Sequence, residues 1–135
     1  MAEMPDMAQR LYNRGLALWQ SKRLGEALES IEQALALEPS AAEVWHHRGL
    51  VLRDLARHEE ATFCFDTASR LKQDAVTLYD HGNDLHARKN YEGAIECYSR
   101  AIKIRPDFAE AFFNRGYTWW ALKDFEAGTA DVERG

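Results

Sequence analysis

The chain has 135 residues, of which 46% are hydrophobic and 29% charged, and it carries a net charge of −5. This length and composition predict about one globular domain and argue against disorder over most of the chain. The acidic balance and the lack of a Lys/Arg run argue against binding to a nucleic-acid backbone. No apolar stretch approaches the ~20 residues that span a bilayer, and the first residues do not read as a secretory signal. We therefore expect a cytoplasmic protein that does not insert into membranes.

The sequence repeats itself four times. Each repeat has a glycine at its centre, and successive glycines are 34, 33 and 34 residues apart: Gly15, Gly49, Gly82 and Gly116. In every repeat an apolar residue lies four positions before the glycine and another lies three positions after it, which is the spacing of a helical face. Twelve positions after each glycine a second face of this kind begins at a small residue. The spacing predicts two helices of about 12–14 residues in each repeat, joined by a short turn, and no strand.

In chain order we expect a tail at 1–7 and repeats at 8–41, 42–74, 75–108 and 109–135, together forming one domain. Pro39 and Pro106 close the first and third repeats, because proline cannot continue a helix. The second repeat is one residue short and has Gln73 where its neighbours have proline. The fourth repeat has Gly128 where the others have alanine, which favours helix by about 1 kcal/mol. We expect its second helix to be truncated.

This pattern resembles the tetratricopeptide repeat, and it accounts for about three and a half to four repeats. The likeness is carried best by Trp45–x2–Arg48–Gly49–x2–Leu52 and by Ala94–x3–Tyr98 followed by Pro106. The resemblance implies an all-α fold, a right-handed α-solenoid of antiparallel helix pairs that form a superhelix. One departure is the leucine expected just before each glycine, which is replaced by Arg14, Arg48, His81 or Arg115; the alkyl stem of arginine can still pack.

Two stripes run along the first helix of each repeat. One carries the motif residues and is expected to pack against other helices, so Trp119 is expected to be structural. The other is displaced by one residue, about 100° round the helix, and the resemblance implies that it lines a concave groove, into which Trp120 would point. We call this second set the first-helix stripe; its members are Tyr12, Leu16, Trp19, His46, Leu50, Arg53, Tyr79, Asn83, His86, Phe113, Tyr117 and Trp120.

The composition of the first-helix stripe predicts a protein-recognition surface. Exposed aromatic side chains with polar tips are typical anchors at such surfaces. Asn83 suits hydrogen bonds to a peptide, and His46, Arg53 and His86 would favour an acidic partner. The stripe therefore predicts binding of a peptide segment of a partner protein. Because tyrosine and asparagine are common at these positions in the family, ordinary packing is the alternative interpretation.

Some tetratricopeptide domains bind an acidic C-terminal peptide with a carboxylate clamp of cations and asparagines. The matching positions here hold Tyr12, Leu16, His47, Val76 and Asp80 or, one repeat later, His46, Leu50, Asp80, Glu110 and Asn114. Neither set contains the required cations, and each contains a carboxylate that would repel the ligand. We therefore expect a binding mode of another type.

The sequence predicts no catalytic, metal or cofactor site, so we do not expect an enzyme. His46 and His47 are adjacent and diverge on a helix, and His81 and His86 are not at the i, i+4 spacing of a helical zinc pair. Cys64 and Cys97 lie at equivalent positions of successive repeats, about 10 Å apart and so beyond disulfide reach. We expect both to be free thiols.

Two further interpretations stay open. A solenoid normally ends in a capping helix with a polar outer face, and none follows the fourth repeat, so Phe112, Trp119 and Phe125 would stay partly uncovered. This end would support a self-assembling scaffold, a homo-oligomer formed through the C-terminal repeat. The chain would equally suit a piece cut from a longer repeat array. The sequence does not identify a partner.

Overall fold

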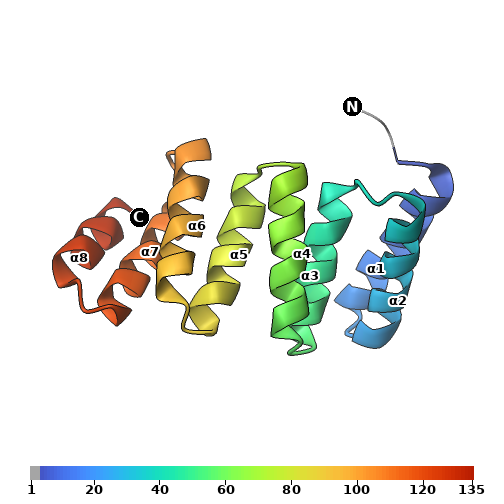
Figure 1. Ribbon diagram of the computed structural model, residues 1–135, viewed down its shortest axis with the longest axis horizontal. Coiled ribbons are helices and arrows are strands. Elements are labelled where there is room, and N and C mark those ends of the chain that lie inside the picture. The colour runs from blue at the N-terminus through green and yellow to red at the C-terminus, as the bar shows by residue number, and fades with distance from the viewer. Residues whose placement is uncertain (1–3) are drawn as a thin grey trace. The chain divides into compact units, whose positions relative to one another are not determined.

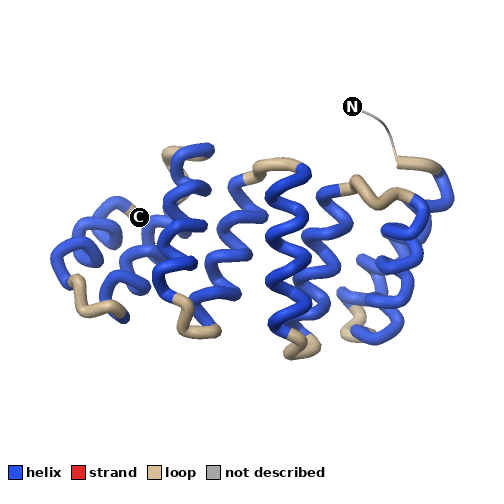
Figure 2. Tube along the Cα trace, in the orientation of Figure 1, coloured by secondary structure: helices blue, strands red, loops and turns tan. Residues whose placement is uncertain are grey.

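The computed structural model describes residues 4–135 and, within them, consists of helices joined by short turns, with no strand (Figures 1 and 2). The helices are α1 (Asp6–Gln20), α2 (Leu24–Leu37), α3 (Ala42–Asp54), α4 (His58–Leu71), α5 (Ala75–Ala87), α6 (Tyr91–Ile104), α7 (Ala109–Ala121) and α8 (Phe125–Arg134). They pack as consecutive antiparallel pairs, which confirms the predicted all-α fold of helix pairs. The right-handed sense of the solenoid stays a prediction. Of the predicted tail, residues 1–3 lie outside the described residues, and α1 already begins at Asp6.

The pairs gather into two compact units. The first unit extends to Lys72 and contains α1 to α4; the second extends from Gln73 to Gly135 and contains α5 to α8. Within the first unit α2 packs against α3, and within the second α6 packs against α7. The division falls at the end of the repeat that the sequence shows to be one residue short.

The repeated glycines lie where a large side chain of the second helix packs on the backbone of the first. A Cβ atom added at Gly49 would lie 2.8 Å from Cε1 of Phe65, and one added at Gly82 would lie 2.7 Å from Cε1 of Tyr98. Both rings are almost completely buried. Such distances are too short for a Cβ contact, so the close packing of each pair requires glycine at these positions.

Each first helix ends in the same left-handed turn. Seven residues after each central glycine the backbone has a φ between 61° and 66°, at Lys22, Ala56, Lys89 and Lys123. The next amide reaches back five residues, as from Arg23 N to the Leu18 carbonyl at 2.9 Å. This is the Schellman arrangement that satisfies the last carbonyls of a helix. It reverses the chain in the short turn that the sequence predicts.

Two arginines join the second helices of successive repeats. Arg48 donates to Glu32 Oε2 at 2.8 Å and, through Nη1, lies 2.9 Å from Cys64 Sγ. Arg115 makes the equivalent bridge in the second unit. Its guanidinium donates to both carboxylate oxygens of Asp131, at 2.6 and 2.7 Å, and to Ser99 Oγ at 3.0 Å. The guanidinium groups of these two arginines therefore link α2 to α4 and α6 to α8, in addition to any packing of their aliphatic carbons.

In the α7–α8 pair the side chain of Trp120 packs directly on the backbone of Gly128. The indole of Trp120 occupies the space that a Cβ atom on Gly128 would need, and the carbonyl oxygen of Gly116 would lie 2.8 Å from that atom. A glycine that weakens the helix by itself thus permits a close contact between helices. At ten residues, α8 is also shorter than the other second helices.

We expect Gly128→Ala to lower the free energy of unfolding by about 1–3 kcal/mol, because overpacking against Trp120 and the α7 backbone outweighs the gain in helix propensity. Gly25→Ala in α2 is the matched control, since a Cβ atom there would meet nothing within 4 Å; it should stabilise by up to about 1 kcal/mol. Urea unfolding measures both. A Gly128→Ala variant as stable as Gly25→Ala would contradict the packing described.

Candidate functional site

The first-helix stripe is buried to very different extents along the chain. Tyr12 is only 6% exposed, and His46 and Leu50 are also buried, so the expectation that these positions offer exposed contacts is wrong for these three. Tyr117, by contrast, is 50% exposed. The other members are half-buried: Leu16, Trp19, Arg53, Tyr79, Asn83, His86, Phe113 and Trp120.

In the first unit the aromatic members of the stripe join α1 to α3. The Tyr12 hydroxyl lies 2.8 Å from Nδ1 of His47, and Trp19 Nε1 donates to Asp54 Oδ2 at 2.8 Å. Both rings also meet the His47 ring edge-on, at 5.4 and 5.8 Å between centroids. Burial, assisted by the carboxylate of Glu43, raises the pKa of Tyr12 to about 12. These side chains are tied into the unit, which explains why Tyr12 is not exposed.

In the second unit the stripe contributes to a network of polar side chains. Asn114 Nδ2 donates to the hydroxyl of Tyr79 at 2.9 Å and to Asn83 Oδ1 at 2.8 Å. Asn83 Oδ1 also accepts a hydrogen bond from the Tyr98 hydroxyl at 2.6 Å. Desolvation by burial raises the pKa of Tyr98, so its hydroxyl remains a donor at neutral pH. The network joins α5, α6 and α7.

The hydrogen-bond partners of Thr118 define the proton position on His86. The Thr118 hydroxyl donates its single proton to the Asn114 carbonyl at 2.7 Å. At 2.8 Å from Nδ1 of His86, the same oxygen must therefore accept, so His86 carries its proton on Nδ1. When His86 is neutral, its Nε2 is an acceptor.

A hollow of about 160 Å³ opens beside this network. It is lined by side chains of α5, α6 and α7: Asn83, His86, Tyr98, Asn114 and Tyr117. Three of the five belong to the predicted stripe. The other two were not predicted as site residues. Tyr98 belongs to the repeat motif. Asn114 lies one position beyond the stripe, among the positions compared with the carboxylate clamp, and its amide was the available signal.

The two adjacent tryptophans are both half-buried. Trp120 lies over Gly128 of α8, and its ring meets that of Tyr117 edge-on at 5.2 Å between centroids. Because Trp120 packs within the α7–α8 pair, it supports Tyr117 rather than standing free of the protein. Tyr117 is therefore the aromatic member of the stripe that a partner reaches most readily.

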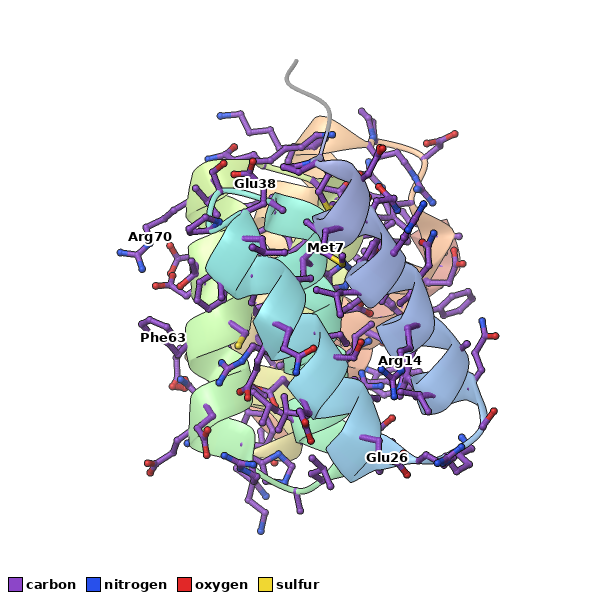
Figure 3. All side chains as sticks on the ribbon, turned by 90° about the vertical axis from the view of Figure 1, so that its right-hand side faces the viewer. Met7, Arg14, Glu26, Glu38, Phe63 and Arg70 are labelled. Carbon is purple, nitrogen blue, oxygen red and sulfur yellow. The ribbon has the colours of Figure 1, made fainter. Side chains whose placement is uncertain are left out.

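Another hollow, of about 190 Å³, lies between α1 and α2 and away from the stripe. It is lined by Arg14, Glu26, Glu29, Ser30 and Gln33, of which Figure 3 labels Arg14 and Glu26. The Ser30 hydroxyl donates to the Leu11 carbonyl at 2.7 Å and so holds the two helices together. The lining of this hollow carries charges of both signs, and its one hydroxyl, that of Ser30, is already hydrogen-bonded. The hollow therefore resembles an ordinary polar surface.

Three other features of the described residues bear on function. Cys64 and Cys97 are buried, and neither forms a disulfide. Between residues 4 and 135, no group of three or more His, Cys, Asp or Glu side chains is placed to hold a metal ion. Over the same residues, none of the helices combines the length and apolar character that a membrane crossing requires.

The fold and the repeat pattern define the class of α-solenoid, helical-repeat proteins. Models of the tetratricopeptide repeat match residues 8–41 and 42–74, and a further TPR repeat model matches residues 82–123. The chain belongs to the tetratricopeptide repeat family. Repeats of this family generally mediate protein–protein interactions and form protein-binding scaffolds.

Known proteins share the repeat over nearly the whole chain. Protein FlbA of Caulobacter vibrioides is 26% identical over 129 residues, which cover 96% of this chain and 16% of FlbA. A probable UDP-N-acetylglucosamine–peptide N-acetylglucosaminyltransferase SPINDLY of Hordeum vulgare is 22% identical over 134 residues, 93% of this chain and 14% of that protein. The chain thus spans about a seventh of the length of these relatives.

Among solved structures, MamA of Desulfovibrio magneticus RS-1 superposes with a TM-score of 0.90 at 21% identity. The match covers 98% of this chain and 75% of the MamA chain. At this identity the likeness concerns the fold.

Proposed function

We propose that this protein is an adaptor without catalytic activity of its own, and that it binds a peptide segment of a partner protein through the first-helix stripe of its second unit. The observation that carries the proposal is the exposed ring of Tyr117 at the edge of the hollow lined by Asn83 and Asn114. An aromatic anchor beside polar groups with spare hydrogen-bonding capacity is the usual composition of a recognition site.

Rigidity of the second unit supports this assignment. Tyr79, Asn83 and Asn114 are held in place by their mutual hydrogen bonds, and Tyr117 rests on Trp120. A preformed surface loses little conformational entropy when a ligand binds. We expect micromolar affinity for a short segment, about −8 kcal/mol. In the first unit the equivalent aromatic side chains are already bonded to α3, so we expect a smaller contribution there.

Selection of short random peptides against the wild-type protein supplies a probe for the test. Tyr117→Ala should weaken the binding of a selected peptide by about 1–3 kcal/mol, or about 5- to 150-fold in Kd. Because half of this side chain is exposed, circular dichroism should show unchanged helicity. Isothermal titration calorimetry gives the Kd.

Phe125→Ala is the matched control, because Phe125 is an equally large aromatic residue, 63% exposed, on α8 rather than on a first helix. A selected peptide should bind Phe125→Ala with the same Kd as it binds the wild-type protein. Selected peptides that bind Tyr117→Ala as tightly as wild type would remove the stripe as the binding surface.

We propose a cytoplasmic location, because cysteines that form no disulfide are typical of a reducing compartment. Cys64 and Cys97 are both buried and neither is in a disulfide, which supports this location.

Self-association through the α7–α8 pair is the second candidate, and the exposure of Phe125 together with that of Leu122 favours it. Covering these apolar side chains with a second copy would be favourable, and a symmetric dimer would close the contact. Light scattering over a tenfold concentration range should then show a mass that rises with concentration and that Phe125→Glu returns to the monomer value. A wild-type protein that stays monomeric throughout would exclude this candidate.

A further inference from the structure

One aromatic side chain of the first unit lies at a position that no repeat buries. Phe63 is 56% exposed and projects outward from α4 (Figure 3). At the equivalent position of the other second helices stand Glu29, Glu96 and Ala130, and all three are exposed. Because this position faces solvent in every repeat, packing within the protein does not account for a phenylalanine there.

The ring of Phe63 is held in place by a second aromatic side chain. It meets the indole of Trp45 on α3 edge-on, with 6.0 Å between the ring centroids. Trp45 is itself fixed, because its Nε1 donates to the Pro39 carbonyl at 2.7 Å. Phe63 therefore presents a preformed aromatic surface, which loses little conformational freedom when a ligand covers it.

Carboxylates flank Phe63 along the same helix. Glu59 lies four residues before it and Asp66 three residues after it, so each is a neighbour of Phe63 on the helix surface, and both are exposed. Asp66 forms an ion pair with Arg70 at 3.3 Å, but both side chains are more than half exposed, so this pair is weak. An accessible ring thus lies between two accessible negative charges.

The second helices of the first unit carry an excess of negative charge. α2 has three glutamates and no lysine or arginine, and α4 has two glutamates and one aspartate against one arginine. Arginines from α3 and the turns pair with Glu26, Glu32 and Glu60 and offset part of this charge. In the second unit, by contrast, the charges of α6 balance. Charge complementarity therefore favours a cationic ligand beside Phe63.

A guanidinium group matches both the ring and the carboxylates. It is planar and can stack on an aromatic face while its N–H groups donate to carboxylate oxygens. An ammonium group is more strongly hydrated and does not stack in this way. An apolar side chain would cover the ring but would desolvate the carboxylates without replacing their hydrogen bonds, which is unfavourable.

We propose that Phe63, together with Glu59 and Asp66, is a docking site for an arginine side chain in a basic segment of a partner protein. This site lies in the first unit. It does not depend on the peptide site proposed for the second unit, so Tyr117→Ala should leave it unchanged.

A short blocked peptide of alternating glycine and arginine is the probe. In an NMR titration of the labelled protein at low ionic strength, the largest shifts should fall on the Phe63 ring and on the backbone amides of Glu59 and Asp66. The same peptide with lysine should bind at least about threefold more weakly. With citrulline, which keeps the shape of arginine but has no charge, binding should weaken about tenfold or more.

Two substitutions test the site from the protein side. Phe63→Leu keeps an apolar side chain but removes the aromatic face, and it should raise the Kd of the arginine peptide about three- to tenfold. Glu59→Gln should raise it about two- to fivefold. Glu92→Gln makes the same change at the equivalent exposed position of α6 and should leave Kd unaltered. All three side chains are wholly or partly exposed, so circular dichroism should show unchanged helicity.

Several results would overturn the proposal. Equal binding of the arginine and lysine peptides would reduce the effect to unspecific charge attraction, and equal binding to Phe63→Leu and wild type would remove the ring from the site. Shifts centred on Tyr117, or no shifts at millimolar peptide, would contradict it as well. Shifts of the α4 amides that grow with the concentration of the protein alone would assign this surface to a second copy of the chain instead.

Discussion

Replacing Phe65 with alanine is expected to lower the free energy of unfolding by about 3–5 kcal/mol. The ring is completely buried between α3 and α4 and lies against Gly49, which has no side chain that could move into the vacated space. The cavity would therefore persist, and a cavity adds to the lost transfer free energy. Urea unfolding followed by circular dichroism measures the change.

Phe63→Ala is the control for this prediction, since it removes the same side chain two residues earlier on α4. Phe63 is 56% exposed (Figure 3), and its truncation should cost less than about 1 kcal/mol. If both variants lost the same stability, or if Phe65→Ala lost under 1 kcal/mol, the packing of the first unit would differ from the one described.

The second large effect is expected for Arg115→Met. This substitution keeps much of the stem but removes the guanidinium that holds both oxygens of the buried Asp131 carboxylate. An unpaired carboxylate at a buried position is costly, and because Arg115 itself is half-buried we expect a loss of about 2–4 kcal/mol. Arg23→Met provides the comparison. The ion pair between Arg23 and Glu26 is exposed, so this substitution should change the free energy of unfolding by no more than about 0.5 kcal/mol.

A double variant separates the charge effect from the loss of packing. When Asp131→Leu is added to Arg115→Met, no buried charge remains, and most of the lost stability should return. A double variant as unstable as Arg115→Met alone would assign the loss to geometry at the α7–α8 pair. An Arg115→Met variant as stable as Arg23→Met would show that the pair does not join the helices.

The spacing of the central glycines was sufficient to predict the helix pairs. Gly49, for example, is required because the ring of Phe65 on the second helix lies on its backbone. The need for glycine therefore arises within one helix pair and is visible in the sequence. The turns follow the same logic, although the left-handed residue in each is lysine or alanine and gives no glycine signal. Contacts between successive repeats were harder to predict, because they depend on which helices become neighbours.

The candidate site shows the same division. The helical period correctly placed Asn83 and Tyr117 on one stripe, and both line the hollow. It did not show that Tyr12 would be buried against His47, because these residues are 35 positions apart. Nor did it show that Trp120 would lie on α8, since this contact depends on the missing side chain of Gly128. Periodicity gives the direction of a side chain, whereas burial depends on the neighbouring helix.

The most direct test of peptide binding by the second unit is an NMR titration of the isotopically labelled protein with a selected peptide. Peptide binding at this hollow predicts that the largest shifts fall on the side-chain amides of Asn83 and Asn114 and on the backbone amide of Tyr117. Shifts concentrated instead on the second helices α6 and α8, with the Asn83 and Asn114 amides unmoved, would contradict it.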